Sequence, residues 1–314
     1  MTTPAPNRPV PPTGEQFRIS HGPQEAVVTE VGAGLRSYTV DGVPVLFGYD
    51  ETQECHAGRG QHLLPWPNRV ADGRYTFDGV VQQLPLSEPE RHNAIHGLTR
   101  WTPWRVVDHG EASVTHELRL FPQTGWPATL DLTVAHALDE EGLAVTVTAT
   151  NVGAAAAPFG YACHPYLTVG EARVDEVELT VPAQNYLDVD DRLLPVAVEP
   201  VAGSDYDCRA GAALGARVFD TAFTGMSRGE DDRWWVRLRR GERETALWAD
   251  ASCGWVQVFT GDTLGGAARR ASGIAVEPMT CGPNAFNEGP TRAGTIVLTP
   301  GESVSVRWGI VAKV

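Results

Sequence analysis

The apolar residues of this chain recur mainly at every second position, which is the period of a β-strand with one buried face. The clearest case is residues 128–138, where apolar side chains alternate with Asp131 and Thr133. After a turn at residues 139–142, the alternation resumes over residues 143–150 with threonines on the polar face. These two segments predict a long antiparallel hairpin that has one face in solvent.

Three further pairs of short alternating segments flank turn-forming residues, and each pair predicts a hairpin. The pairs are 74–77 with 80–84 around Asp78-Gly79, 234–239 with 245–248 around a polar glycine-containing turn, and 295–298 with 303–308 around Pro300-Gly301. No long segment keeps a helical period, and the chain's 33 glycines and 23 prolines interrupt it throughout. The pattern therefore predicts an all-β fold, a large antiparallel β-sandwich.

The chain shows no change of composition that would mark a linker, and it has no internal repeat. We therefore expect residues 17–314 to form a single sandwich domain. Residues 1–16 contain five prolines but lack the basic region and apolar core of a signal peptide, so we expect a flexible tail. Residues 188–220 are long enough to include loops that carry function.

Composition excludes several classes of function. Of the 314 residues 42% are hydrophobic, which suffices for a large core, and no apolar run reaches the ~18 residues of a membrane span. The formal net charge of −14 argues against nucleic acid and anionic membranes as partners. The only lysine is Lys313, near the C-terminus, which argues against Schiff-base catalysis and a Walker-type phosphate loop.

The cysteines are odd in number and scattered, with no C-x-x-C pair, so they predict neither a zinc ribbon nor a disulfide framework. They are Cys55, Cys163, Cys208, Cys253 and Cys281. We expect buried free thiols and a cytoplasmic protein.

Four histidines fall into two groups. His116 and His136 lie on the inward faces of strands, where we expect hydrogen-bonded core residues. His96 follows a polar stretch closed by glycine, and His164 stands among glycine, proline and tyrosines, so both are candidates for function. His92 and His96 have the spacing of the H-E-x-x-H zinc motif, but its glutamate is missing and the context is not helical, so we expect no metal site.

Glu277 closes the apolar strand 273–277, and Pro278 is expected to end that strand. An acid in this place has the setting of a desolvated base, although strand-end acids are usually solvated. Gln257 lies between Trp255 and Phe259, an arrangement that suits sugar binding as well as a hydrogen-bonded core amide. No G-x-S-x-G or G-x-G-x-x-G motif is present, which argues against a serine hydrolase and a Rossmann site.

Several short motifs together resemble the aldose 1-epimerase (galactose mutarotase) family, in its order and approximate spacing. They are Pro65-Trp66-Pro67-Asn68-Arg69-Val70, Gly73-Arg74-Tyr75, Asn93-Ala94-Ile95-His96-Gly97-Leu98, His164-Pro165-Tyr166, Asp220-Thr221-Ala222-Phe223, Trp255-Val256-Gln257-Val258 and Val276-Glu277-Pro278. The resemblance spans residues 17–314 and implies the family's antiparallel supersandwich.

The resemblance also implies roles for individual residues. Glu277 matches the family's general base and His164 its general acid, while His96 and Arg69 match residues that orient and polarise the sugar. The matching sugar contacts are Asn68, Tyr166, Asp220 and Gln257. Leu98 stands where the best-known members have glycine, and the residues after His164 also differ. These departures resemble a divergent bacterial branch and leave the preferred sugar open.

The chemistry that this implies is the interconversion of α- and β-anomers of a free aldohexose. One group protonates the ring oxygen while another removes the proton of the anomeric hydroxyl, and the opened aldehyde rotates and recloses. This requires an acid and a base on opposite sides of C1, and neither a metal nor a cofactor. The expected partner is a small sugar, and the protein is expected to be a monomer or homodimer.

Three alternatives stay open on the sequence. A hexose-6-phosphate 1-epimerase would need arginines at the mouth of the site, for which Arg59, Arg74 and Arg100 are candidates. A glycoside hydrolase would need a second carboxylate opposite Glu277. A non-catalytic sugar-binding protein would need no acid–base pair.

Overall fold

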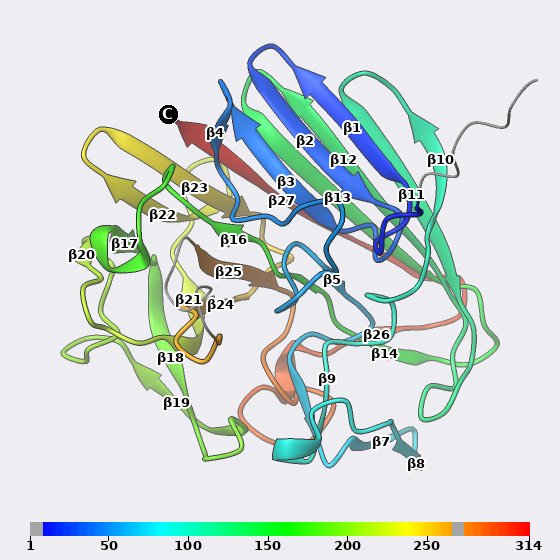
Figure 1. The fold of residues 1–314 in the computed structure, drawn as a ribbon. Helices are drawn as coiled ribbons and strands as arrows, with labels where there is room; N and C mark the ends of the chain where they lie inside the picture. The colour runs from blue at the N-terminus through cyan, green and yellow to red at the C-terminus, as the bar shows by residue number, and fades with distance from the viewer. Residues whose placement is uncertain (1–8, 266–272) are drawn as a thin grey trace, which may run out of the picture.

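The computed structural model describes residues 9–265 and 273–314, and these residues form antiparallel sheets joined by turns and loops (Figure 1). The largest sheet has nine strands. In spatial order they are β10 (Arg105–His109), β11 (Ser113–Leu120), β12 (Leu130–Asp139), β13 (Gly142–Asn151), β27 (Ser303–Lys313), β23 (Arg243–Ala249), β22 (Trp234–Arg240), β17 (Glu178–Thr180) and β20 (Ala212–Ala213). The all-β prediction is confirmed.

A second sheet of eight strands carries most of the residues singled out in the sequence. Its order is β19 (Pro195–Pro200), β18 (Ala183–Val189), β21 (Asp220–Met226), β24 (Trp255–Phe259), β25 (Ile274–Met279), β15 (Ala162–Cys163) and β5 (His62–Leu63), with β16 (Tyr166–Leu167) also paired to β25. A four-stranded sheet lies across β11 and β12 (Figure 1). It contains β1 (Gln16–His21), β2 (Gln24–Thr29), β3 (Leu35–Val40) and β4 (Val43–Pro44).

The remaining elements are short. Three strand pairs are β14 (Ala157–Phe159) with β26 (Ile296–Leu298), β6 (Arg69–Ala71) with β9 (Asn93–Ile95), and β7 (Arg74–Phe77) with β8 (Val80–Gln83). The 3₁₀ turns are η1 (Pro89–Arg91), η2 (Val174–Glu176) and η4 (Arg292–Gly294). Within the described ranges, no helix is long and apolar enough to cross a membrane.

The β12–β13 hairpin forms with the register that the alternation predicts, pairing Leu138 with Leu143. Its apolar face is buried, because Leu130, Leu132 and Val134 are fully covered. The predicted hairpins β7–β8 and β22–β23 also form. In the first, Asp78 and Gly79 both have positive φ, as a type I′ turn requires.

The predicted hairpin around Pro300-Gly301 is wrong, although both of its strands exist. β26 pairs with β14, whereas β27 lies between β13 and β23 in the nine-stranded sheet. The alternation of residues 295–308 is a local signal, and it cannot show which distant strand supplies the hydrogen-bonding partner.

Part of the segment predicted as a flexible tail, residues 13–16, is packed against the rest of the protein. Residues 1–8 lie outside the described residues. Thr13 is buried, and the Val31 N–H donates to its carbonyl at 3.1 Å. The Glu30 N–H donates to the Glu15 carbonyl at 2.9 Å, and β1 begins at Gln16. Residues 13–16 thus pack against the sheet that β1 opens.

A buried polar chain joins the two large sheets. The His62 ring on β5 contacts the His136 ring on β12 through their Nε2 atoms at 3.3 Å. His62 Nδ1 meets the Tyr161 hydroxyl at 3.0 Å, and the Trp308 indole donates to that hydroxyl at 2.7 Å. The prediction of a hydrogen-bonded core histidine is thus confirmed for His136.

For His116 the prediction is only half right. Its ring is fully buried, but neither nitrogen has a hydrogen-bond partner in the described part of the chain. The ring packs edge-to-face against Phe17 at 5.1 Å, so it fills the core as an aromatic group. All five cysteines lie within the described residues and are buried free thiols, as predicted.

Candidate active site

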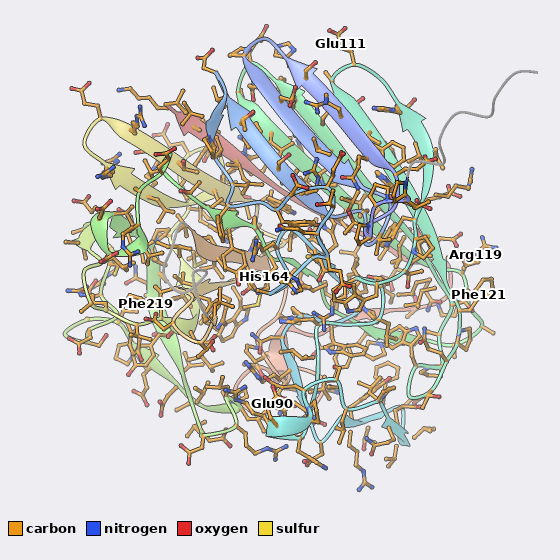
Figure 2. All side chains as sticks on the ribbon, in the orientation of Figure 1. Glu90, Glu111, Arg119, Phe121, His164 and Phe219 are labelled. Carbon is orange, nitrogen blue, oxygen red and sulfur yellow. The ribbon has the colours of Figure 1, made fainter. Side chains whose placement is uncertain are left out.

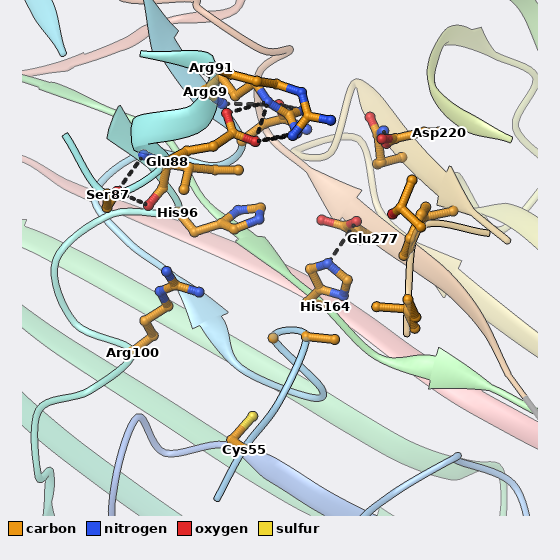
Figure 3. Close-up of a pocket in the computed structure, with 18 of the residues that line it drawn as sticks. Cys55, Arg69, Ser87, Glu88, Arg91, His96, Arg100, His164, Asp220 and Glu277 are labelled. Atoms are coloured by element: carbon orange, nitrogen blue, oxygen red, sulfur yellow. Dashed lines mark hydrogen bonds and ion pairs between the residues drawn. The ribbon is translucent and has the colours of Figure 1, made fainter. Parts of the chain in front are cut away.

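A cavity of about 320 Å³ opens beside the eight-stranded sheet (Figure 3). The eight residues that the sequence nominates all line it, and Figure 2 places His164 near the middle of the molecule. They are Asn68, Arg69, His96, His164, Tyr166, Asp220, Gln257 and Glu277. Folding therefore brings together residues that span more than two hundred positions of sequence.

Three neighbouring strands supply one wall of the cavity. Glu277 on β25 is paired directly with Gln257 on β24, and Asp220 begins β21 on the other side of β24. Directly opposed residues on antiparallel strands project to the same face, so their side chains share the cavity. The Gln257 amide donates to an Asp220 carboxylate oxygen at 2.7 Å, which fixes the orientation of both.

The prediction that Pro278 ends the strand is wrong, because β25 continues to Met279. The Val276 N–H donates to the Pro165 carbonyl, so the nitrogen of Pro278, two residues on, faces the same side. On that side β25 pairs with β16 at Ala275 and with β15 at Met279, and the ladder is interrupted between them. A proline is tolerated there because no strand partner needs its missing N–H.

His164 and Glu277 are in direct contact, with Nε2 and Oε1 3.2 Å apart (Figure 3). Both are nearly fully buried, at 6% and 2% exposure. The imidazole stacks on Tyr166 with ring centres 5.1 Å apart, and the Tyr166 hydroxyl donates to the Ala57 carbonyl. Gly58 lies beneath the ring, where a Cβ would come within 3.1 Å of it. The imidazole is thus held from two sides.

Burial sets the protonation of this pair. Loss of solvent raises the pKa of Glu277 well above its usual value, and the nearby charge of Asp220 raises it further. Burial lowers the pKa of His164 to about 4. Both directions favour the neutral form of each group, because burial disfavours charge on either one. The resemblance implied an acid and a base on opposite sides of C1, whereas in this structure the two side chains touch each other.

His96 forms the adjoining wall, with its ring edge-on to that of His164 at 5.6 Å. The backbone N–H of His96 donates to the Asn68 carbonyl at 2.9 Å, which links the loop of His96 to the strand that starts at Arg69. Burial, together with repulsion from His164, lowers the pKa of His96 well below its usual value. The ring is therefore neutral and offers one donor and one acceptor.

Arg69 is held by Glu88, a residue that the sequence analysis did not find. The guanidinium Nε and Nη2 donate to Glu88 oxygens at 2.8 and 2.9 Å. Burial would raise the pKa of Glu88, but hydrogen bonds from Arg69 and Asn93 outweigh it and hold that pKa below its usual value. Glu88 stands in a charged run that looks like a solvated surface, so no local signal marks it.

Of the three arginines considered for a phosphate clamp, only Arg100 lines the cavity. Its guanidinium lies 5.3 Å from the ring of Trp101, an exposed residue at the rim. Arg59 donates to the Gly48 carbonyl, and Arg74 is exposed elsewhere on the surface. Among the described residues, no carboxylate forms an ion pair with Arg100, and burial lowers its pKa.

Four buried polar atoms of the lining residues have no hydrogen-bond partner within the described residues. They are His96 Nδ1, His164 Nδ1, Gln257 Oε1 and Glu277 Oε2. An unpaired buried polar atom costs about 1–3 kcal/mol, so these four atoms are available to hydrogen-bond a polar ligand. In the described ranges, no three histidine, cysteine or acidic side chains cluster as a metal would require.

The fold and the cavity together define a β-sandwich protein with a buried histidine–glutamate pair in a polar cavity. The chain belongs to the aldose 1-epimerase family, whose model matches residues 15–310. The uncharacterized protein YihR of Escherichia coli (strain K12) is 33% identical over 278 residues, covering 88% of this chain and 87% of that protein.

Two further comparisons agree. Human galactose mutarotase is 28% identical over 295 residues, which cover 86% of this chain and 82% of that protein. The crystal structure of a galactose mutarotase-like protein from Clostridium acetobutylicum has the same fold, with a TM-score of 0.83 over 94% of each chain at 17% identity.

Proposed function

We propose that this protein is an isomerase that interconverts the α- and β-anomers of a free aldohexose. The observation that carries the proposal is the buried His164–Glu277 pair, whose Nε2 and Oε1 atoms lie 3.2 Å apart among unpartnered polar atoms of the cavity. Ring opening needs one proton delivered to the ring oxygen and one removed from the anomeric hydroxyl, and such a pair supplies both. The names of the relatives support the same reaction.

The reaction begins from the form of the pair in which His164 carries the proton. This form arises from the neutral pair by transfer of the Glu277 proton across the 3.2 Å contact. The carboxylate takes the proton of the anomeric hydroxyl, the imidazolium protonates the ring oxygen, and the C1–O5 bond breaks. Rotation about C1–C2 and the reverse transfers close the ring with the other configuration and restore the pair.

The other lining residues hold the sugar. Arg69 lies on one side of the pair and Asp220 on the other (Figure 3). Asn68 is hydrogen-bonded to Arg69 and Gln257 to Asp220, so hydroxyls on both edges of a ring meet donors and acceptors. Neutral His96 adds a hydrogen bond without adding charge beside His164. Opposed polar walls of this kind bind a hydroxylated ring in a defined orientation.

A panel of sugars tests the proposal. NMR exchange spectroscopy between anomers, run with the wild-type protein on free aldohexoses and their 6-phosphates, measures the rate for each. The proposal expects acceleration of at least one free aldohexose far above its rate in buffer. If the protein bound sugars but accelerated anomer exchange for none of them, the proposal would be wrong and the protein would be a non-catalytic sugar-binding protein.

The setting of Arg100 supports a second candidate function, that of a hexose-6-phosphate 1-epimerase. Its guanidinium is partly buried at the cavity and lacks an acidic partner among the described residues, and a phosphate would provide one. On the free-sugar proposal, a 6-phosphate does not raise kcat/KM. A gain of about tenfold or more, equal to ~1.4 kcal/mol of transition-state binding, would favour the phosphorylated substrate.

A further inference from the structure

Two segments far apart in the sequence meet behind Arg69. One is the turn between β18 and β19, which carries Arg192, and the other is residues 88–93. The Arg192 guanidinium donates to the Arg91 and His92 carbonyls, both at 3.0 Å. It also donates to the Asp72 carboxylate at 2.8 Å. One side chain thereby ties three stretches of chain together.

Asn93 continues this connection toward the cavity. Its amide donates to the Arg192 carbonyl at 3.2 Å and to a Glu88 carboxylate oxygen at 2.9 Å, while its oxygen accepts from Arg192 at 3.2 Å. Glu88 and Asn93 also exchange two backbone hydrogen bonds, of 3.0 and 3.1 Å. Because Asn93 is fully buried, water does not compete for these bonds.

Glu88 in turn fixes the direction of Arg69. The two side chains are only 7% and 10% exposed, and their paired contact occupies Nε and Nη2 of the guanidinium. The remaining nitrogen, Nη1, donates to Asn68 Oδ1 at 3.3 Å. Asn68 is itself one of the proposed sugar contacts. A bidentate pair sets orientation as well as charge, which a single contact cannot do.

We propose that Glu88 is a positioning residue for Arg69, and that Arg192 keeps Glu88 in place through Asn93. The inference rests on the proposed function only in taking Arg69 as a sugar contact. Glu88 lines the cavity, but its carboxylate is engaged by Arg69 and Asn93, and Arg192 is not among the lining residues. Their expected effect is therefore on how firmly the sugar is held. Losing either one lets the guanidinium turn away and leaves the His164–Glu277 pair intact.

Glu88→Gln and Arg192→Ala test the chain of contacts. Glu88→Gln keeps the shape but removes the charge, and we expect KM to rise about tenfold with kcat changed less than threefold, the effect of weakening a charge-assisted bond that holds substrate. Arg192→Ala should raise KM by a smaller factor. In the double variant the two effects should not multiply, because they act through one guanidinium. Arg209→Ala is the matched control.

Arg209 suits this purpose because it is similarly exposed, at 35% against 37% for Arg192. It makes several hydrogen bonds of its own, to Asp207 and Gln184, but none to the segment of Glu88. If Arg209→Ala shifted KM as Arg192→Ala does, the effect would be general and the proposal wrong.

A spectroscopic measurement separates this proposal from the proposed function. The Arg69 Nε–H signal in a ¹H–¹⁵N spectrum, assigned by its loss in Arg69→Gln, reports the contact with Glu88 without any substrate. We expect it to shift or broaden in Glu88→Gln and Arg192→Ala, and to stay unchanged in Arg209→Ala. An unchanged signal in Arg192→Ala overturns the connection, whether or not the protein turns over a sugar. If that variant does not fold, Arg192→Lys takes its place with the same two outcomes.

Discussion

Acid should destabilise this fold through its buried core histidines, and His116 isolates the effect most cleanly. Burial lowers the pKa of His116 to about 4, from an ordinary value near 6.5. The unfolded chain therefore binds a proton that the folded chain rejects. His116 therefore leaves the free energy of unfolding unchanged above pH 6.5 and lowers it progressively as the pH falls toward 4.

The magnitude follows from the pH interval. At pH 5, which is 1.5 units below the unfolded pKa, protonation of the unfolded chain lowers the free energy of unfolding by roughly 2 kcal/mol for this one residue. That is a large part of the ~5–15 kcal/mol by which a typical domain is stable. His62 and His136 act in the same direction, because burial lowers the pKa of each well below 6.5.

Urea unfolding at pH 7 and pH 5 measures the effect. In His116→Gln the difference in unfolding free energy between the two pH values should shrink by about 2 kcal/mol relative to wild type. His56→Gln, at an exposed position, is the control and should leave the difference unchanged. If His116→Gln keeps the full wild-type difference, His116 does not stay neutral in the folded protein and the reasoning fails.

Two further substitutions probe the cavity. Gly58→Ala places a Cβ 3.1 Å from the His164 ring at a φ of +70°, so the anomer exchange rate should fall by about tenfold or more while the protein stays folded. Circular dichroism and NMR exchange check this, and an unchanged rate would show that the added methyl group does not displace the His164 ring from its working position. Arg100→Gln should alter kcat/KM for hexose 6-phosphates but not for free hexoses if Arg100 binds a phosphate. Equal effects on both would assign Arg100 to general sugar binding.

The strands were predictable because alternation is a local property. Residues 128–138 and 143–150 reveal their buried face within a dozen positions, and the turn between them fixes their pairing. Residues 295–308 show the same alternation, yet their strands pair with partners about 150 positions earlier. Pairing of that kind depends on tertiary packing, which the alternation does not record.

The candidate site divides in the same way. Glu277 and His164 have unusual neighbours in the sequence and could be nominated, but their 3.2 Å contact comes from the pairing of β25 with β15 and β16. Glu88 and Arg192 lie in polar segments that look like surface. Their importance arises only when two loops a hundred residues apart pack together.

The central claim is that Glu277 moves the anomeric proton, and Glu277→Gln tests it most directly. The amide keeps the volume and one acceptor oxygen but cannot take a proton. NMR exchange should show the rate on the best free aldohexose reduced by at least about 10²-fold. The dissociation constant of that sugar should change far less, because Arg69, Asp220 and Gln257 remain. Glu111→Gln, on the exposed surface, should match wild type. A folded Glu277→Gln protein that still exchanges anomers at the wild-type rate would contradict the account.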